Sequence, residues 1–370
     1  WNGFLGDGSS YRGNANTPVE FDATTGKNIA WNVPLMGRGI SGALVVGDRV
    51  FVSSCDGEHE RDLYLQAFDL NDGSELWTRF MRATGRPFTH PTGSNAGPTP
   101  VSDGKHVIAL FSSNDLMCYD LQGNLQWYRA VALDYPKMGN DISMSSSPVI
   151  ADGAVVVQLE NQGNSIAAGF DVTTGEELWS MKRREQSNYS SPSVVKTGDQ
   201  DVVVLGNSEG VKLVHPRSGK VIQQLDASAD TVSSIAYSAP LMIIPGESTT
   251  VFRLGAGGEK AELLWDSQRL RPQRASPVIS DDRVYMCRGS VLVAGTLSDG
   301  TIQWQARLGK IKGGWSTPVV TASGIYVCDD DGTVVVVKDE GSKGKIIATN
   351  ELDATVLSSA AVVNDAIIYR

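Results

Sequence analysis

The side chains best suited to chemistry are arginines and aromatic residues in the segments that connect the repeated units of the chain. A guanidinium presents a planar fork of N–H donors that matches a carboxylate or sulfate, and a Trp or Tyr ring offers a flat face for stacking. Together they predict a pocket for a planar or extended anion. The candidate ligand-binding residues are Arg38, His90, Asp141, Asn188, Tyr189, Tyr237, Arg271, Arg274 and Trp315.

Trp315 follows two glycines and lies outside the repeated tryptophan position. A large aromatic ring in that setting is either a stacking platform for a ligand or a local plug, and the sequence leaves both open.

Catalytic and metal-binding patterns are not recognisable. The four histidines (His59, His90, His106 and His215) do not accompany a serine or cysteine in a nucleophile motif. The run 329–332, Asp-Asp-Asp-Gly, lacks the alternating ligands and the distal glutamate of a calcium loop and is typical of a turn. We therefore predict no catalytic residue, no metal ligand and no required cofactor.

A repeated unit determines where these residues lie. Its clearest copy is residues 170–179, FDVTTGEELW, followed by the Ser-Ser-Pro-Ser-Val run at 190–194. Short segments rich in Val, Ile and Tyr and bounded by Gly and Asp predict strands, as at 277–279, 283–286, 290–294 and 301–304. Four strands in a period of roughly 40–50 residues are typical of a propeller blade. We predict an all-β fold with almost no helix.

The number of copies predicts an eight-bladed propeller of four-stranded antiparallel blades. Seven copies are complete, and the eighth combines strands at 360–363 and 366–369 with strands at 19–21 and 29–31. Pairing N-terminal with C-terminal strands in one blade closes the ring and removes two sheet edges. The predicted division is a leader at 1–18 and one domain at 19–370, with its eighth blade built from about 19–31 plus 358–370. Seven blades with an unpaired half-blade is the alternative.

Charge is unevenly distributed. The net charge is −10, which argues against a nucleic-acid partner. The segments that link the fourth strand of each predicted blade to the first strand of the next hold 15 Lys and Arg against 8 Asp and Glu, a local charge of +7. These segments would surround one end of the central channel, which we call the channel mouth. A basic mouth on an acidic body is suited to an anionic ligand, although long surface loops also collect such residues.

The cellular compartment of the protein is inferred from the start of the chain, from the lack of a long apolar run and from the cysteines. The chain begins at Trp1 rather than Met, so we expect an upstream targeting segment to have been removed. No apolar run is long enough to span a membrane. Cys287 and Cys328 hold equivalent places in neighbouring repeats, so they are either buried thiols or a disulfide.

The Asp-x-x-Thr-Gly-x-x-x-Trp turn with Ser-Ser-Pro-Val resembles the repeat of the PQQ-binding-like propellers, which include quinoprotein alcohol dehydrogenases. The compact form is more similar to the propeller lipoprotein of the outer-membrane barrel-assembly machine, a non-catalytic scaffold. The chain lacks the vicinal cysteine pair of the dehydrogenases and a clear calcium set. The resemblance implies export, and it implies that six tryptophans pack one blade on the next. These are Trp31, Trp77, Trp127, Trp179, Trp265 and Trp304.

We expect an extracytoplasmic, monomeric binding module or assembly scaffold that meets a protein partner or an anionic ligand at the channel mouth. One alternative is a quinoprotein dehydrogenase holding pyrroloquinoline quinone (PQQ) with calcium, with Asp141 or Glu160 as a possible base. The other is recognition of an anionic polysaccharide, which the same arginines could serve.

Overall fold

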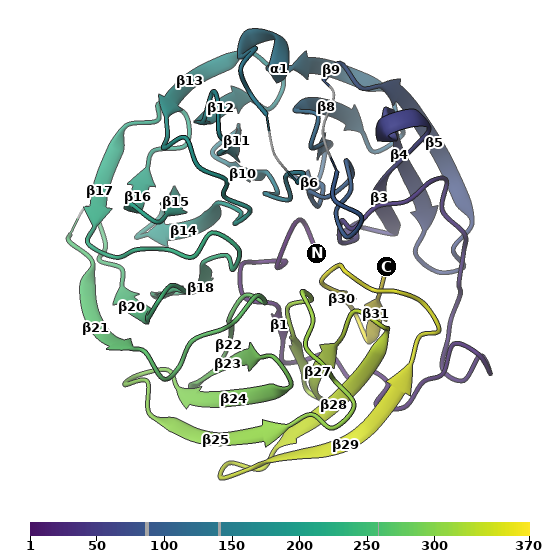
Figure 1. Cartoon of the computed structure of the whole chain (residues 1–370), viewed down its shortest axis with the longest axis vertical. Helices are drawn as coiled ribbons and strands as arrows, with labels where there is room; N and C mark the ends of the chain where they lie inside the picture. The colour runs from purple at the N-terminus through teal and green to yellow at the C-terminus, as the bar shows by residue number, and fades with distance from the viewer. Residues whose placement is uncertain (86–88, 140–141, 258) are drawn as a thin grey trace.

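The computed structural model describes residues 1–85, 89–139, 142–257 and 259–370, and it is a ring of β-sheets around a central channel (Figure 1). Within these residues the helices are a 3-10 turn, η1 (Glu58–Glu60), and one short helix, α1 (Val131–Asp134). None of the helices in this part of the chain is long and apolar enough to cross a membrane. The predicted all-β propeller is confirmed.

Seven blades are four-stranded antiparallel sheets in chain order, with the first strand nearest the channel and the fourth on the outside (Figure 1). Blade one consists of β2 (Leu44–Val46), β3 (Arg49–Asp56), β4 (Asp62–Asp69) and β5 (Glu75–Arg82). Blade two consists of β6 (Val101–Ser102), β7 (His106–Leu110), β8 (Asp115–Asp120) and β9 (Leu125–Ala130). Blade three consists of β10 (Val149–Ala151), β11 (Ala154–Leu159), β12 (Ile166–Asp171) and β13 (Glu177–Lys182). Blades four and five are β14 (Ser193–Thr197), β15 (Gln200–Asn207), β16 (Gly210–Val214), β17 (Val221–Leu225); and β18 (Ala236–Ser238), β19 (Leu241–Ile244), β20 (Thr249–Arg253), β21 (Glu262–Ser267). Blades six and seven are β22 (Val278–Ser280), β23 (Arg283–Arg288), β24 (Val291–Thr296), β25 (Ile302–Arg307); and β26 (Val319–Thr321), β27 (Gly324–Cys328), β28 (Thr333–Asp339), β29 (Gly344–Glu351).

The repeated turn is formed by local interactions, which blade three illustrates. In blade three the Asp171 carboxylate accepts the backbone N–H of Thr173 at 2.9 Å, and Gly175 adopts a φ of +73°, which favours glycine. The ladder between the third and fourth strands shifts register between Gly169 and Phe170, and all seven four-stranded blades have such a shift near the end of the third strand. The repeat therefore encodes the same bend in every blade.

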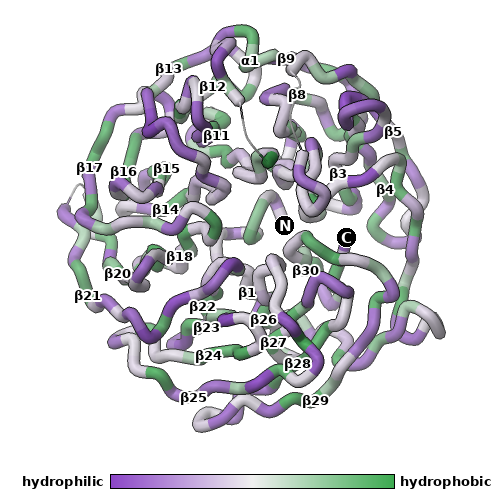
Figure 2. Tube along the Cα trace, in the orientation of Figure 1, coloured by the Kyte–Doolittle hydropathy of each residue, from purple (hydrophilic) through white to green (hydrophobic). Residues whose placement is uncertain are grey.

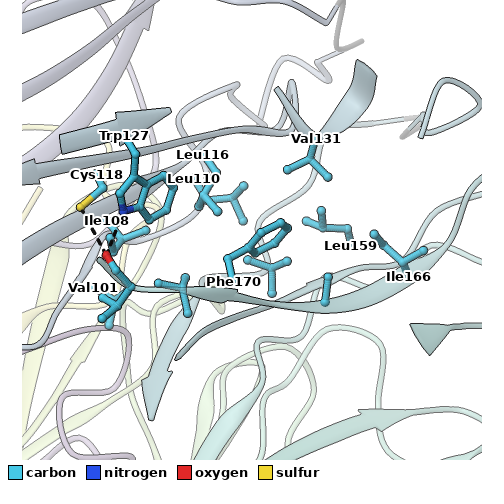
Figure 3. Packing of buried hydrophobic residues seen from close by; sticks show 14 of the residues in the cluster. Val101, Ile108, Leu110, Leu116, Cys118, Trp127, Val131, Leu159, Ile166 and Phe170 are labelled. Carbon is cyan, nitrogen blue, oxygen red and sulfur yellow. Dashed lines mark hydrogen bonds between the residues drawn. The ribbon is translucent and has the colours of Figure 1, made fainter. Parts of the chain in front are cut away.

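Tryptophans from the end of one blade reach the turn of the next. The Trp127 indole (Figure 3) donates its N–H to the carbonyl of Val172 at 2.8 Å. A Cβ added to Gly175 would come within 2.6 Å of the Trp127 ring. An equivalent indole N–H bond crosses five of the other seven boundaries, from Trp31 to Leu70, Trp77 to Leu121, Trp179 to Pro216, Trp265 to Leu297, and Trp304 to the Asp339 side chain.

The apolar core is divided among the blades and their boundaries. One cluster joins blades two and three through buried residues that include Leu110, Leu116, Trp127, Leu159 and Phe170 (Figure 3). Hydrophobic positions are spread over every blade rather than collected in one segment (Figure 2). All four cysteines are buried and free, so Cys287 and Cys328 form no disulfide. Burial raises the pKa of both thiols to about 12.

The eighth blade combines both ends of the chain, as predicted, but its outer part differs from the prediction. The C-terminal residues form a two-stranded sheet, β30 (Ala361–Val363) and β31 (Ala366–Ile368). The expected strands at 19–21 and 29–31 do not form: this segment packs beside β31 without a ladder, and its bridges join Asp22 to Lys27 and to Glu351. The backbone of residues 19–23 is bonded instead to Asn350 and Glu351 in blade seven.

The first residues of the chain lie in the central channel (Figure 1). Backbone hydrogen bonds hold them to first strands around the ring. The N–H of Val45 donates to the carbonyl oxygen of Trp1 at 2.8 Å, and the N–H of Tyr237 donates to the carbonyl oxygen of Gly8 at 3.0 Å. Residues Tyr11–Arg12 then form β1, which pairs in parallel with β26 and adds a fifth strand to blade seven. Residues 1–12 of the predicted leader are therefore part of the channel structure.

Candidate functional site: the channel mouth

A cavity of about 350 Å³ opens at the channel mouth, where the segments preceding each first strand converge. All eight blade boundaries contribute to it, because its lining includes one residue just ahead of the first strand of each blade. Phe4 of the channel segment lines the cavity as well. The propeller geometry thus gathers residues that are far apart in sequence into one site.

A ring of seven hydroxyl groups forms part of this lining. Each accepts a hydrogen bond of 2.9–3.2 Å from the backbone N–H of the equivalent residue in the preceding blade. Within the described part of the chain, none donates its own O–H to another protein group, so these protons are available to a ligand. The ring consists of Thr99, Ser147, Ser191, Ser234, Ser276, Thr317 and Ser359, and Gly42 occupies the eighth place.

Arg274 and Trp315 form the most distinctive pair in the lining. The Arg274 guanidinium carbon lies 4.5 Å from the centre of the Trp315 ring, a cation–π contact. Trp315 is 40% exposed, and its backbone N–H donates to Asp330 Oδ1 at 3.2 Å. Burial raises the pKa of Asp330, and the adjacent Asp329 carboxylate acts in the same direction. The pair therefore presents a fixed cation and a partly exposed ring to the same opening.

His90 and Tyr189, two of the candidate ligand-binding residues, also line the cavity. His90 Nδ1 lies 2.8 Å from the Thr92 hydroxyl, and the backbone N–H of Tyr189 donates to the Thr231 carbonyl at 2.7 Å. Apolar side chains complete the wall: Phe4, Ile40, Ile142, Val232 and Leu357. The cavity thus combines an apolar wall with hydrogen-bond donors.

Four predicted residues lie elsewhere. Arg38 is held beside the mouth by an ion pair of 3.1 Å with Glu60 and a bond of 3.1 Å to the Pro91 carbonyl. Tyr237 is buried in β18, where its hydroxyl contacts the Lys196 backbone. Arg271 lines a separate polar cavity with Glu247 and Arg288. Asn188, the fourth, is buried.

Asn188 belongs to a network around the buried carboxylate of Glu160. Its amide donates to Glu160 Oε2 at 3.1 Å, the Asn207 amide lies 3.3 Å away, and Arg183 donates through Nε. The side chains of Arg183 and Glu160 are only 3% and 2% exposed. Glu160 is thus fully engaged and is not placed to act as a base at the mouth. Asp141, the other candidate base, lies outside the described residues.

The hydroxyl ring was not among the predicted site residues, although a signal for it was present. Five of its members precede a proline that lies directly before a first strand, as in Ser147-Pro148 and Thr317-Pro318. The position recurs once per blade, and any residue that recurs in this way must form a ring around the axis. The repeat thus supplies part of the cavity lining as well as the fold.

The described lining does not fit the PQQ–calcium pair of the quinoprotein dehydrogenases. Calcium takes six to eight oxygen ligands, usually with several carboxylates, and the described residues of the cavity lining include no carboxylate. Over the described residues no cluster of three or more His, Cys, Asp or Glu side chains could hold a metal ion. One arginine, Arg274, would face all three carboxylates of the quinone.

Several solved structures have a fold similar to that of this chain. BamB from Moraxella catarrhalis is 15% identical, with a TM-score of 0.66 over 89% of this chain and 90% of that one. A europium-containing methanol dehydrogenase is 12% identical, with a TM-score of 0.65 over 95% and 85%. A quinohemoprotein alcohol dehydrogenase from Comamonas testosteroni is 11% identical, with a TM-score of 0.64 over 88% and 69%. At these identities the likeness shows a shared propeller fold.

No curated protein matches the chain by sequence. The model of one protein family, described as outer membrane protein assembly factor BamB, matches residues 6–167 and 138–255, which is more than half of the chain. The repeated turns and the Ser-Pro strand starts within these residues are the features that suggested the resemblance. The chain therefore belongs to the PQQ-like repeat family of the outer membrane protein assembly factor BamB.

Proposed function

We propose that this protein is an extracytoplasmic binding module, acting as an assembly scaffold without catalysis of its own, and that the channel mouth binds an anionic or acceptor-rich segment of a partner protein. The family description, an outer membrane protein assembly factor, supports the assembly role. The observation that carries the proposal is the Arg274–Trp315 pair at the rim of an open cavity.

The chemistry of the lining supports a ligand rich in acceptors. Its described residues supply one guanidinium and seven free hydroxyl protons but no carboxylate. Tryptophan, tyrosine and arginine are also the side chains that most often dominate the energy of protein interfaces. The cavity offers all three, with an apolar wall that can exclude water around them.

Substitutions at the rim test the proposal. Trp315→Ala and Arg274→Ala should each weaken partner binding at least tenfold, because such anchor residues typically carry about 2 kcal/mol or more. The partner would be identified by photo-crosslinking from the mouth, and its affinity measured with purified components. Leu125→Ala is a matched control, since Leu125 is 50% exposed on the outer strand β9, away from the segments that form the mouth. Equal affinity for all three variants, with unchanged melting temperatures, would refute the mouth as the binding site.

A further inference from the structure

Within the described residues, the eighth blade has two strands and no third strand. In blade seven the second strand, β27, pairs with β26 on one side and with β28 on the other. In the eighth blade β31 pairs only with β30. Because alternate residues of an antiparallel strand point their N–H and C=O groups to opposite neighbours, β31 keeps an outer edge without a ladder.

The side chains of β31 at this edge are also more exposed to solvent than those of β27, the second strand of blade seven. Ile325, Tyr326 and Val327 in the second strand of blade seven are only 2–3% exposed. Ile367 and Ile368 of β31 are only partly buried. Beside them is a cavity of about 320 Å³, whose lining includes Phe21, Trp31, Leu352, Ile367 and Tyr369. We call this cavity the third-strand slot.

The chain's own N-terminal segment does not fill the slot, and the reason is visible in its bonds. The Asn350 side chain donates to the Val19 carbonyl at 3.0 Å and accepts from the Phe21 N–H at 2.9 Å. Ala23 N–H donates to the Glu351 carbonyl at 3.2 Å. Three backbone groups of residues 19–23 are therefore bonded to blade seven, and no ladder in the described part of the chain joins this segment to β31.

We propose that the third-strand slot binds an extended segment of a partner polypeptide, which pairs with β31 and completes the eighth blade. An apolar ligand could cover the side chains but would leave the edge N–H and C=O groups unpaired, whereas a strand satisfies both. The other blades indicate the chemistry of the occupant. Their third strands β8, β12 and β24 are six residues long, and every charged residue in them is an aspartate at the end of a strand. Asp365 is the only charged residue in the described lining of the slot.

Peptide binding tests this proposal independently of the channel mouth. The probe is a labelled peptide copying residues 290–299, SVLVAGTLSD, which contains β24. We expect saturable binding by fluorescence anisotropy. The same peptide with proline in place of Val293 should bind at least tenfold more weakly, because proline cannot donate to a ladder. Equal binding of the two peptides, or no saturable binding, would overturn the proposal.

Variants of the protein locate the binding. Ile367→Asp places a charge in the slot and should reduce peptide affinity at least tenfold. Leu263→Asp is the matched control, since Leu263 is 56% exposed on the outer strand β21, and it should bind the peptide like the parent protein. If Ile367→Asp fails to fold, Ala366→Cys replaces it. Ala366 is exposed beside the slot, so a cysteine there should form a disulfide with a cysteine-bearing peptide, and no trapping would count against the slot.

Hydrogen exchange separates the possible occupants. In the free protein the Ile367 amide should exchange much faster than that of Val327, and the peptide should slow it at least tenfold. Equal protection of the two amides without peptide would show that the same polypeptide already fills the slot. A concentration-dependent dimer that Ile367→Asp abolishes would assign the slot to a second copy. Either result would overturn the assignment to a partner.

Discussion

The indole N–H of Trp127 in blade two donates to the carbonyl of Val172 in blade three at 2.8 Å. The same ring covers Gly175, where an added Cβ would lie 2.6 Å from it. A tryptophan and the glycine of the next turn are therefore complementary, and each boundary that has this pair is closed by one bond and one close contact.

The first prediction concerns this contact. Gly175→Ala should destabilise the protein by about 1–3 kcal/mol more than Gly26→Ala, because overpacking adds to the backbone strain. The control is closely matched: both glycines end a Thr-Thr-Gly turn, at φ +73° and +75°, but nothing lies within 4 Å of a Cβ at Gly26. Urea unfolding measures both. Equal losses of unfolding free energy in the two variants would show that the Trp127 ring moves aside without destabilising the protein.

A second prediction concerns the buried network in blades three and four. Arg183→Met should destabilise the protein by about 3–5 kcal/mol, because it leaves the Glu160 carboxylate buried without its cation. Arg183→Met with Glu160→Gln should recover part of that loss. Chemical denaturation of the single and double variants checks this. A double variant no more stable than the single one would contradict the account.

The sequence predicts the fold well because its signals recur. Turn aspartates, turn glycines and docking tryptophans repeat with one period, so a blade weakly marked in one copy is identified from the others. The same regularity explains why His90, Tyr189, Arg274 and Trp315 meet: each lies in a segment that the repeat assigns to the mouth.

Features without a period could not be predicted. The path of residues 1–12 through the channel depends on backbone bonds to Val45, Ser102, Tyr237 and Val320, which any sequence could make. Tyr237 was assigned to the mouth but lies inside β18, because the boundary between linking segment and strand is fixed only by the ladder. The third-strand slot likewise depends on bonds from residues 19–23 to Asn350 and Glu351, which no repeated signal marks.

A third prediction concerns the stability of the protein at low pH. Burial alone would raise the pKa of Asp171, but bonds from the Thr173 backbone N–H and from Arg217 outweigh it and hold this pKa below its ordinary value of 3.8. A depressed pKa stabilises the fold fully above the ordinary value, and this stability is lost as the pH falls below 3.8. Asp171→Asn should cost about 1–2 kcal/mol at pH 7. Urea unfolding from pH 7 to pH 3 should show a shallower acid loss for the variant, and parallel curves would contradict the assignment.

The last prediction decides between scaffold and quinoprotein. Calorimetric titration with PQQ, with and without calcium, should give no calcium-dependent binding, because the described lining offers no carboxylate ligand and one guanidinium for three carboxylates. Arg274→Ala serves as the internal control. Micromolar binding that requires calcium and is lost in this variant, together with dye reduction on simple alcohols, would make the mouth a cofactor chamber. Weak binding that is independent of calcium and lost in the same variant would instead report the anion affinity that the Arg274–Trp315 pair is proposed to supply to a protein partner.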